Sequence, residues 1–405
     1  MEAKCNKKHV LFLLVCFLCF NQFFNLFIVD IHVWRILNWF YTTCLTLYVF
    51  KLLLTHKIPV YLRKRWNFIL YFILIIITSF FYVSITTNQT FDETFRVSIT
   101  WFQYLLIFFL YEKKYTTKEL FVSLKIFSFI WFAAWIAGFL SPIPLYDASG
   151  EFDAQQLMST GRGVVRLKVS GSDLMNLWGL WCLGIYVANN KKKYLIAYLV
   201  CLLFVVLCVS RQHILYYSVV GFLFLFYKIA LWKKLILALS LFVLVSYILP
   251  QTTIFQNLTE LTSSQMEAND GGKDDIRIQA ATFYLADYPQ NIYTFFMGHG
   301  AYHSHSNYGR QIYSIIERQG YVLADVGFVS IFFYYGLCGL VCIFCLLRHV
   351  YRSKIPKEFY GLKLFIYFMF LANVFSHNID VSMVSTAICL YVILRVSNRT
   401  KTLPR

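Results

Sequence analysis

Long apolar runs recur along the whole 405-residue chain and restrict its fold more than any other feature. Each is about 17 to 25 residues long, the length with which an α-helix crosses the hydrocarbon core of a bilayer. The runs lie near 10–29, 36–54, 66–86, 95–111, 119–140, 172–189, 194–210, 212–230, 234–250, 323–347, 360–377 and 379–396. A composition of 59% hydrophobic and 14% charged residues does not fit one soluble core. The sequence predicts an all-α polytopic membrane protein with about twelve transmembrane helices.

The first apolar run follows Lys4, Lys7 and Lys8, as the core of a secretory signal peptide would. It continues through Val10–Val29 without a small-residue cleavage site. A signal peptide needs such a site to be removed, so this run is expected to be a retained span.

The loops predicted between the spans differ in positive charge. Basic residues concentrate in the amino terminus, the 55–65 loop, Lys191–Lys193, the 348–363 loop and the tail. Counting the spans between them places all of these segments on the same side of the membrane. Cytoplasmic loops carry the excess of Lys and Arg, so both termini are expected in the cytoplasm. The basic isoelectric point of about 9.3 then reflects topology and does not indicate a nucleic-acid partner.

The outer face carries an unusual kind of basic residue. Eight of the ten basic residues assigned to it are Arg, whereas Lys prevails on the cytoplasmic face. Orientation does not require these Arg, but their planar fork suits bidentate binding of phosphate or carboxylate. The Arg of interest are Arg162, Arg166, Arg211, Arg277, Arg310 and Arg318. They predict a site for a lipid phosphate or an acidic glycan.

Two outer segments, 141–171 and 251–321, are too long for tight connections between helices. They divide the chain into spans one to nine in 1–250, a large outer loop in 251–321, and spans ten to twelve with a tail in 322–405. Loops of this length often carry function, so the site is expected there.

The outer loop contains a predicted short helix. Asp274 or Asp275 is expected to cap its start, and Pro289 to end it. Arg277 falls in the first turn, where it and the helix dipole together would favour an anion. The alternative is that the neighbouring Asp simply neutralises Arg277.

Three histidines follow at His299, His303 and His305. The spacing of the last two suits a strand, and no acidic or Cys ligand follows at a metal-site interval, so no metal is expected. A neutral imidazole at the membrane surface can accept a proton from a sugar hydroxyl or bind a phosphate. Ordinary hydrogen bonding within the loop is the alternative.

Arg211 lies in a very short outer turn, within about one helical turn of the hydrocarbon edge. A charge at that depth is costly unless it is paired or faces a hydrated cavity. Snorkelling to lipid headgroups is the alternative, although it does not explain the other outer Arg.

Local patterns and the hydropathy plan give the chain a family resemblance. Arg211 opens a span that continues to Gly221, Arg277 is followed by Gly298-His299-Gly300, and Asp325 precedes a Gly-Leu-x-Gly pattern at 336–339. Across nearly its whole length the chain resembles the Wzy-type O-antigen and capsular polysaccharide polymerases, and more distantly the O-antigen ligases. The ligase-type His-Asn pattern is only partly met, because Ser306 separates His305 from Asn307.

The resemblance implies a GT-C-like membrane glycosyltransferase of the bacterial inner membrane. Its donor and acceptor would be undecaprenyl-diphosphate-linked oligosaccharides, with no cofactor, and a chain-length regulator is a possible partner beside the membrane lipid. Arg211 and Arg277 would hold the donor diphosphate, and Arg166 or Arg310 that of the acceptor. His305, then His303, then Glu317 or Asp325 are the candidates for general base.

Further substrate contacts are expected from residues of the outer loop and from its many tyrosines. These contacts comprise Arg162, Arg166, Arg310, Arg318, Glu317, Tyr302 and Asn307, and two or three of Tyr284, Tyr288, Tyr293, Tyr302, Tyr308, Tyr313 and Tyr321 are expected to stack on sugar rings. Two rival functions remain open, O-antigen ligase and lipid-linked oligosaccharide flippase. A transporter would be expected to show two matching halves, and no internal repeat is present.

Overall fold

The protein is helical throughout the part described by the structure, a computed structural model. It describes residues 5–26, 30–55, 60–141, 145, 167, 169–208, 211–228, 275–374 and 382–402. The predicted span at 234–250 and most of the outer segment 141–171 lie outside these ranges. Within them the regular elements are helices, as the sequence predicts.

Five helices of the described part are long and apolar enough to cross a membrane. Four of these correspond to α2 (Ile31–Leu54), α3 (Val60–Thr86), α6 (Thr117–Leu140) and α15 (Phe328–Arg352). The fifth is the stretch Phe91–Glu112, built from α4 (Phe91–Ser98), η2 (Ile99–Leu105) and α5 (Leu106–Glu112). These helices support a membrane-embedded protein.

Shorter helices complete the bundle. They are α1 (Lys7–Phe20), α7 (Ser172–Asn189), α8 (Lys192–Leu207), α9 (Arg211–Lys228), α16 (Tyr360–Ala372) and α17 (Met383–Thr402). Helix α7 is buried along most of its length and packs against α6, α8, α9, α16 and α17. The Ser385 hydroxyl of α17 donates to the buried carboxylate of Asp173, which links the first turn of α7 to α17.

The first apolar run does not form the single helix expected over 10–29. Helix α1 ends at Phe20, and Gln22 to Asn25 all have positive φ angles, between 46° and 63°. Asn side chains compensate the helix end, because Asn21 donates to the Phe17 carbonyl at 2.8 Å and Asn38 to the Phe20 carbonyl at 3.1 Å. A helix of 14 residues reaches about 21 Å, less than the thickness of a hydrocarbon core.

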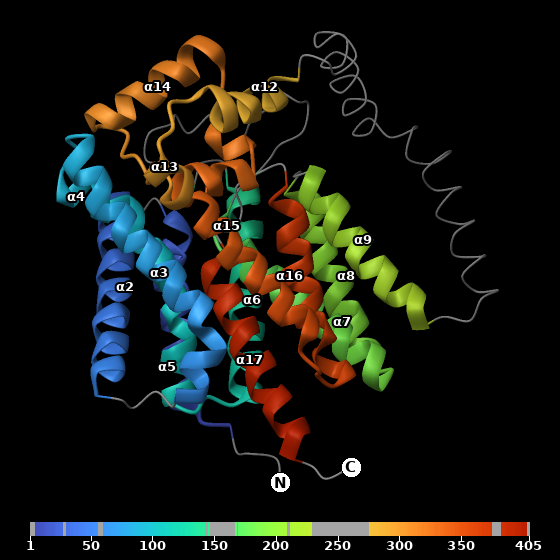
Figure 1. The fold of residues 1–405 in the computed structure, drawn as a ribbon. Helices are drawn as coiled ribbons and strands as arrows, with labels where there is room; N and C mark the ends of the chain where they lie inside the picture. Colours follow the sequence, from blue (N-terminus) through green and yellow to red (C-terminus); the bar gives the residue numbers. More distant parts are fainter. Residues whose placement is uncertain are drawn as a thin grey trace.

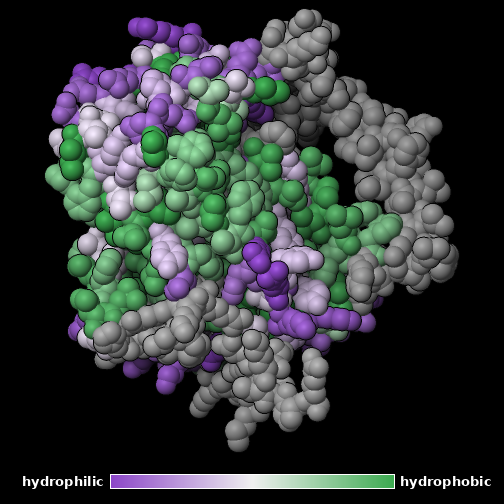
Figure 2. Space-filling view, viewed as in Figure 1, coloured by the Kyte–Doolittle hydropathy of each residue, from purple (hydrophilic) through white to green (hydrophobic). Residues whose placement is uncertain are grey.

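The start of α1 and the end of α17 lie at the same end of the bundle (Figure 1). Glu119 at the start of α6 accepts from the Asn6 amide at 3.1 Å, and Arg395 of α17 donates to the nearby Tyr115 carbonyl. At the opposite end lie α12 (Ile276–Thr282), α13 (Ile292–Met297) and α14 (Asn307–Gln319), which we call the cap (Figure 1). Hydrophobic side chains form a belt between the two polar ends (Figure 2).

The cap has its own small core. It contains Val83 of α3, Phe333 of α15, and Ala280, Tyr284, Tyr308, Ile312, Leu323 and Val326 of the cap and the turn that follows it. Because the first two belong to membrane helices, the cap is fixed to the bundle by hydrophobic burial.

Candidate functional site

Helix α15 is interrupted, and a loop of the cap fills the interruption. Gly336 has φ 64° and ψ −168°, so the α-helical hydrogen bonds that the Phe333 and Tyr334 carbonyls would accept are disturbed. Instead, the His299 amide donates to the Phe333 carbonyl at 2.7 Å, and the Gly300 amide to the Tyr334 carbonyl at 3.0 Å. Within a membrane, backbone groups freed from a helix need such partners.

Two glycines allow this close approach. A Cβ atom on Gly298 would lie 2.3 Å from the Tyr334 backbone, and one on Gly336 would lie 2.3 Å from the Phe296 backbone. The Gly298-His299-Gly300 pattern and the Gly-Leu-x-Gly pattern are therefore two sides of one backbone contact. That contact fixes the start of the histidine loop, which we define as residues 299–306.

Gln89, in the turn between α3 and α4, orders the rest of the histidine loop. Its carbonyl oxygen accepts from the His303 amide at 2.9 Å and from the Ser306 hydroxyl at 2.8 Å. Its amide group donates to the Ala301 carbonyl at 3.2 Å and to the Thr94 hydroxyl at 3.0 Å. The sequence-based interpretation missed this buried residue, which no catalytic pattern marks.

Ser306 begins α14 and thereby ends the loop. Its hydroxyl accepts from the Gly309 amide at 2.9 Å, the usual geometry of a Ser N-cap. Although the spacing of His303 and His305 would suit a strand, these residues lie in a turn before α14. Within the described ranges, no group of three or more His, Cys, Asp or Glu is arranged to hold a metal ion.

His303 and His305 lie side by side but differ in environment. Their ring centroids are 5.6 Å apart, and the His305 amide donates to Nδ1 of His303 at 3.3 Å. In the neutral imidazole, Nε2 of His303 then carries the hydrogen and can donate. Partial burial lowers the pKa of the His303 imidazole below its usual range, whereas His305 is exposed.

Charged residues of α4 lie within electrostatic range of His303. They are Asp92, Glu93 and Arg96. Glu93 accepts from the Thr90 amide and hydroxyl, each at 2.9 Å, in the capping box that begins α4. Arg96 pairs with Asp92 at 2.5 Å and lies over the Trp39 ring, 5.4 Å from its centroid. None of the three was predicted, although Thr90-x-x-Glu93 is a readable helix-start pattern.

The predicted helix around Arg277 is confirmed. Asp275 is the N-cap, accepting from the Arg277 amide at 2.8 Å, and the π-helical turn η7 (Phe283–Asp287) ends before Pro289. The Arg277 side chain itself is exposed.

The described arginines of the cap are exposed and are not buried in a common site. Arg277 on α12 and Arg310 and Arg318 on α14 are all exposed, and the latter two are separated by about 12 Å along one helix. Arg310 donates to the Asn307 amide oxygen at 2.5 Å. The described residues therefore give no support to a shared hollow among these three guanidinium groups.

Other predicted residues are placed as follows. Glu317 and Asp325 are exposed, on α14 and on the turn η8 (Leu323–Asp325) respectively. Arg211 begins α9, but its side chain lies outside the described part, as do Arg162 and Arg166 entirely.

Burial contradicts sugar stacking for two tyrosines. Tyr284 is 0% exposed and donates to the Tyr321 carbonyl at 2.9 Å, and Tyr308 is 3% exposed. Both belong to the core of the cap. Tyr302 is half-buried, with its ring 6.2 Å from that of Tyr308 and 6.0 Å from that of Tyr313. Tyr302 and Tyr313 remain accessible to a ligand.

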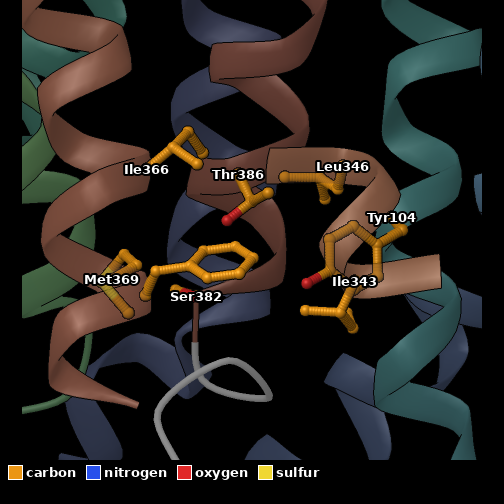
Figure 3. Close-up of a pocket in the computed structure, with 8 residues that line it drawn as sticks. Tyr104, Ile343, Leu346, Ile366, Met369, Ser382 and Thr386 are labelled. Carbon is orange, nitrogen blue, oxygen red and sulfur yellow. The ribbon is translucent and has the colours of Figure 1, made fainter. Parts of the chain in front are cut away.

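A small cavity lies deeper in the bundle, between η2, α15, α16 and α17. It is lined by Tyr104, Ile343, Leu346, Ile366, Met369, Phe370, Ser382 and Thr386, seven of which are labelled in Figure 3. Its few hydroxyl groups are surrounded by apolar side chains. Because none of its lining residues belongs to the cap, we do not include it in the candidate site.

The chain matches no family model and no curated protein. Its class therefore rests on the structure: a membrane-embedded protein, helical throughout its described residues, with a polar cap. The histidine loop, beside the charged residues of α4, is the candidate functional site.

Proposed function

We propose that this protein polymerises undecaprenyl-diphosphate-linked oligosaccharides into O-antigen or capsular polysaccharide, as a metal-independent glycosyltransferase. The proposal places the cap on the periplasmic side of a bacterial inner membrane, with about twelve spans in a GT-C-like arrangement and both termini in the cytoplasm. The observation that supports the proposal most is the position of the histidine loop. Its Gly298-His299-Gly300 pattern, on which the family resemblance partly rests, anchors the loop to α15.

The reaction requires two kinds of group beside the sugars. A base removes the proton from the attacking hydroxyl of the acceptor while the anomeric carbon–oxygen bond to the donor diphosphate breaks. Cationic or hydrogen-bond donors stabilise the negative charge that the departing diphosphate gains. In the proposal the exposed His305 is the base, and His303, whose Nε2 can donate, binds a phosphate or sugar oxygen.

Arginine supplies the remaining stabilisation in the proposal. Arg211 and Arg277 hold the donor diphosphate, and Arg166 or Arg310 that of the acceptor. The exposed side chain of Arg277 would have to close on the substrate, as a lid residue does. Arg96 is a further cation within electrostatic range of His303.

Deleting the gene tests the function in cells that make O-antigen. We expect a lipid A core carrying a single repeat unit. Long lipid-linked chains that never reach the core would identify a ligase instead, and unpolymerised units retained on the cytoplasmic side would identify a flippase. Either pattern would overturn the proposal.

Substitutions test the diphosphate site. Arg211→Ala and Arg277→Ala are each expected to shorten the glycan, and Lys at the same positions is expected to rescue poorly, because it lacks the bidentate fork. Arg352→Ala is the matched control, because Arg352 lies at the end of α15 that is away from the cap. Glycan of normal length in both Ala variants would remove these residues from the site.

A further inference from the structure

An apolar groove opens on the membrane face of the bundle, beside the second half of α4. It is lined by Thr43, Thr46 and Leu47 of α2, Ile77, Phe80 and Phe81 of α3, Phe95 and Ser98 of α4, and Ile99 and Phe102 of η2. Its volume is about 290 Å³. That is near the lower end of the range of about 300–1,000 Å³ found for small-molecule sites.

The few hydroxyl groups on the α2 side of the groove are already engaged. Thr43 donates to the Trp39 carbonyl and Thr46 to the Thr42 carbonyl, each at 2.8 Å. These hydroxyl groups therefore need no hydrogen-bond partner from an occupant of the groove. Leu47 and Phe81 are 65% and 50% exposed, so a hydrocarbon chain can enter from the lipid without displacing the helices.

One end of this groove is charged. Arg96 lies within one helical turn of Phe95, Ser98 and Ile99, and its guanidinium covers the ring of Trp39, one turn before Thr43. Its partner Asp92 is exposed, as is Arg96 itself, so an anionic phosphate can exchange for the carboxylate at little cost. The start of α4 is joined to the histidine loop through Gln89 and Thr94.

We propose that this groove binds the isoprenoid chain of a lipid-linked substrate, with Arg96 as a further cation for the diphosphate of that lipid beside the arginines proposed above. This inference rests on the proposed function and adds to it where the lipid lies. An apolar channel with a cation at one end matches an amphiphile that has a hydrocarbon chain and an anionic head. The head would then lie beside the histidine loop, where the proposed chemistry takes place.

Photolabelling of the full-length protein in phospholipid nanodiscs tests the groove. The probe is undecaprenyl phosphate with a diazirine in its chain, and labelled peptides are mapped by mass spectrometry. We expect labels within 43–47 and 77–81 that excess undecaprenyl phosphate removes and excess phosphatidylglycerol does not. Labels elsewhere, or equal competition by both lipids, would show ordinary membrane lipid only and overturn the proposal.

Variants test both ends of the groove. Leu47→Trp fills its open side and is expected to reduce labelling about tenfold. Leu54→Trp is the matched control, because Leu54 is 78% exposed on the same helix and does not line the groove. Arg96→Gln is expected to weaken competition by undecaprenyl phosphate but not by the uncharged alcohol. Unchanged labelling in Leu47→Trp would contradict the proposal. If a variant fails to fold, the labelling map of the wild-type protein still tests it.

The binding assay also separates the two proposals. If the groove is labelled specifically but the protein makes no polymer, the lipid-binding proposal stands and the polymerase proposal is wrong. If polymerisation is normal but the groove is not labelled, the polymerase proposal stands and the lipid-binding proposal is wrong.

Discussion

Two neighbouring histidines of the cap are suited to different tasks because their surroundings differ. His303 has its Nδ1 engaged by the His305 amide and is half-buried, and both favour the neutral imidazole, which can donate through Nε2. His305 is exposed and has more freedom to reach a substrate hydroxyl. Sequence spacing alone treats the pair as equivalent.

Separate substitutions distinguish the two roles. His305→Gln is expected to lower kcat for glycosyl transfer about 100-fold, because the base is lost. His303→Gln keeps a donor and is expected to change the rate less than about tenfold, whereas His303→Leu loses a hydrogen bond to a charged group and raises KM. Steady-state kinetics with purified lipid-linked donor and acceptor would measure both kcat and KM. Equal loss of kcat in His303→Gln and His305→Gln would contradict this division.

His299 makes stability depend on pH. It stacks on Phe333 with ring centroids 4.8 Å apart, and burial lowers its pKa to about 4. The unfolded chain has the ordinary His pKa of about 6.5, so between these values it binds more protons than the fold. Stability contributed by neutral His299 is complete above about pH 6.5 and is lost as pH falls toward 4, by about 1 to 3 kcal/mol.

Thermal unfolding in detergent between pH 4 and 8 tests this dependence. Replacing His299 by Phe removes the titrating group and is expected to flatten the curve between about pH 4 and 6.5. His32→Phe, at an exposed position on α2, serves as the control and should leave the slope unchanged. If the stability of His299→Phe still depends on pH as steeply as that of the wild type, another titrating group causes the dependence.

At the scale of elements, the interruption of α15 is the feature on which the candidate site depends. The histidine loop donates two backbone hydrogen bonds into the interruption, and Gly298 and Gly336 have the positive φ angles that permit it. The loop and the helix are therefore parts of one structural unit, although the two glycines are 38 positions apart in the chain.

Alanine at either glycine is expected to destabilise the fold. Gly298→Ala and Gly336→Ala each combine an unfavourable φ with a backbone clash at 2.3 Å, so we expect a loss of at least about 2 kcal/mol. Cys338→Ala, two residues further along α15 and half-buried, should cost less than about 1 kcal/mol. Thermal melts of the three purified variants compare these costs, and equal stability of all three would rule out the interrupted geometry.

At the scale of the whole molecule, the polar cap lies at one end of an apolar belt, and the start of α1 and the end of α17 lie at the other (Figures 1 and 2). Lys113 lies beside Tyr115, which contacts both His9 of α1 and Arg395 of α17, and it therefore marks the end that carries the termini. Gln319 is exposed at the end of α14 and marks the cap.

Cysteine labelling tests which end faces outward. In a background without the exposed Cys44 and Cys345, a membrane-impermeant maleimide on intact cells is expected to label Gln319→Cys but not Lys113→Cys. Both should react after permeabilisation. Labelling of Lys113→Cys alone would invert the orientation and place the histidine loop in the cytoplasm, where the proposed polymerisation does not belong.

Local signals in the sequence identified the helices and some of their ends. Hydropathy located α2, α3, α6 and α7, and the Asp275 cap and Pro289 bounded the helix of the cap. These features are predictable because hydrophobicity, capping and the missing proline amide act within a few residues of the chain.

Tertiary structure alone decided where α1 ends, why α15 is interrupted, and which polar groups accompany the histidines. Gln89 and Arg96 are more than 200 residues before His303 in the chain, and Tyr284 and Tyr308 are buried by a core that includes residues of α3 and α15. The exposed positions of Arg277, Arg310 and Arg318 likewise followed from packing rather than residue type. The reason is physical: the partner of a buried backbone or side-chain group is set by what the fold brings near it, and sequence periodicity carries no record of that proximity.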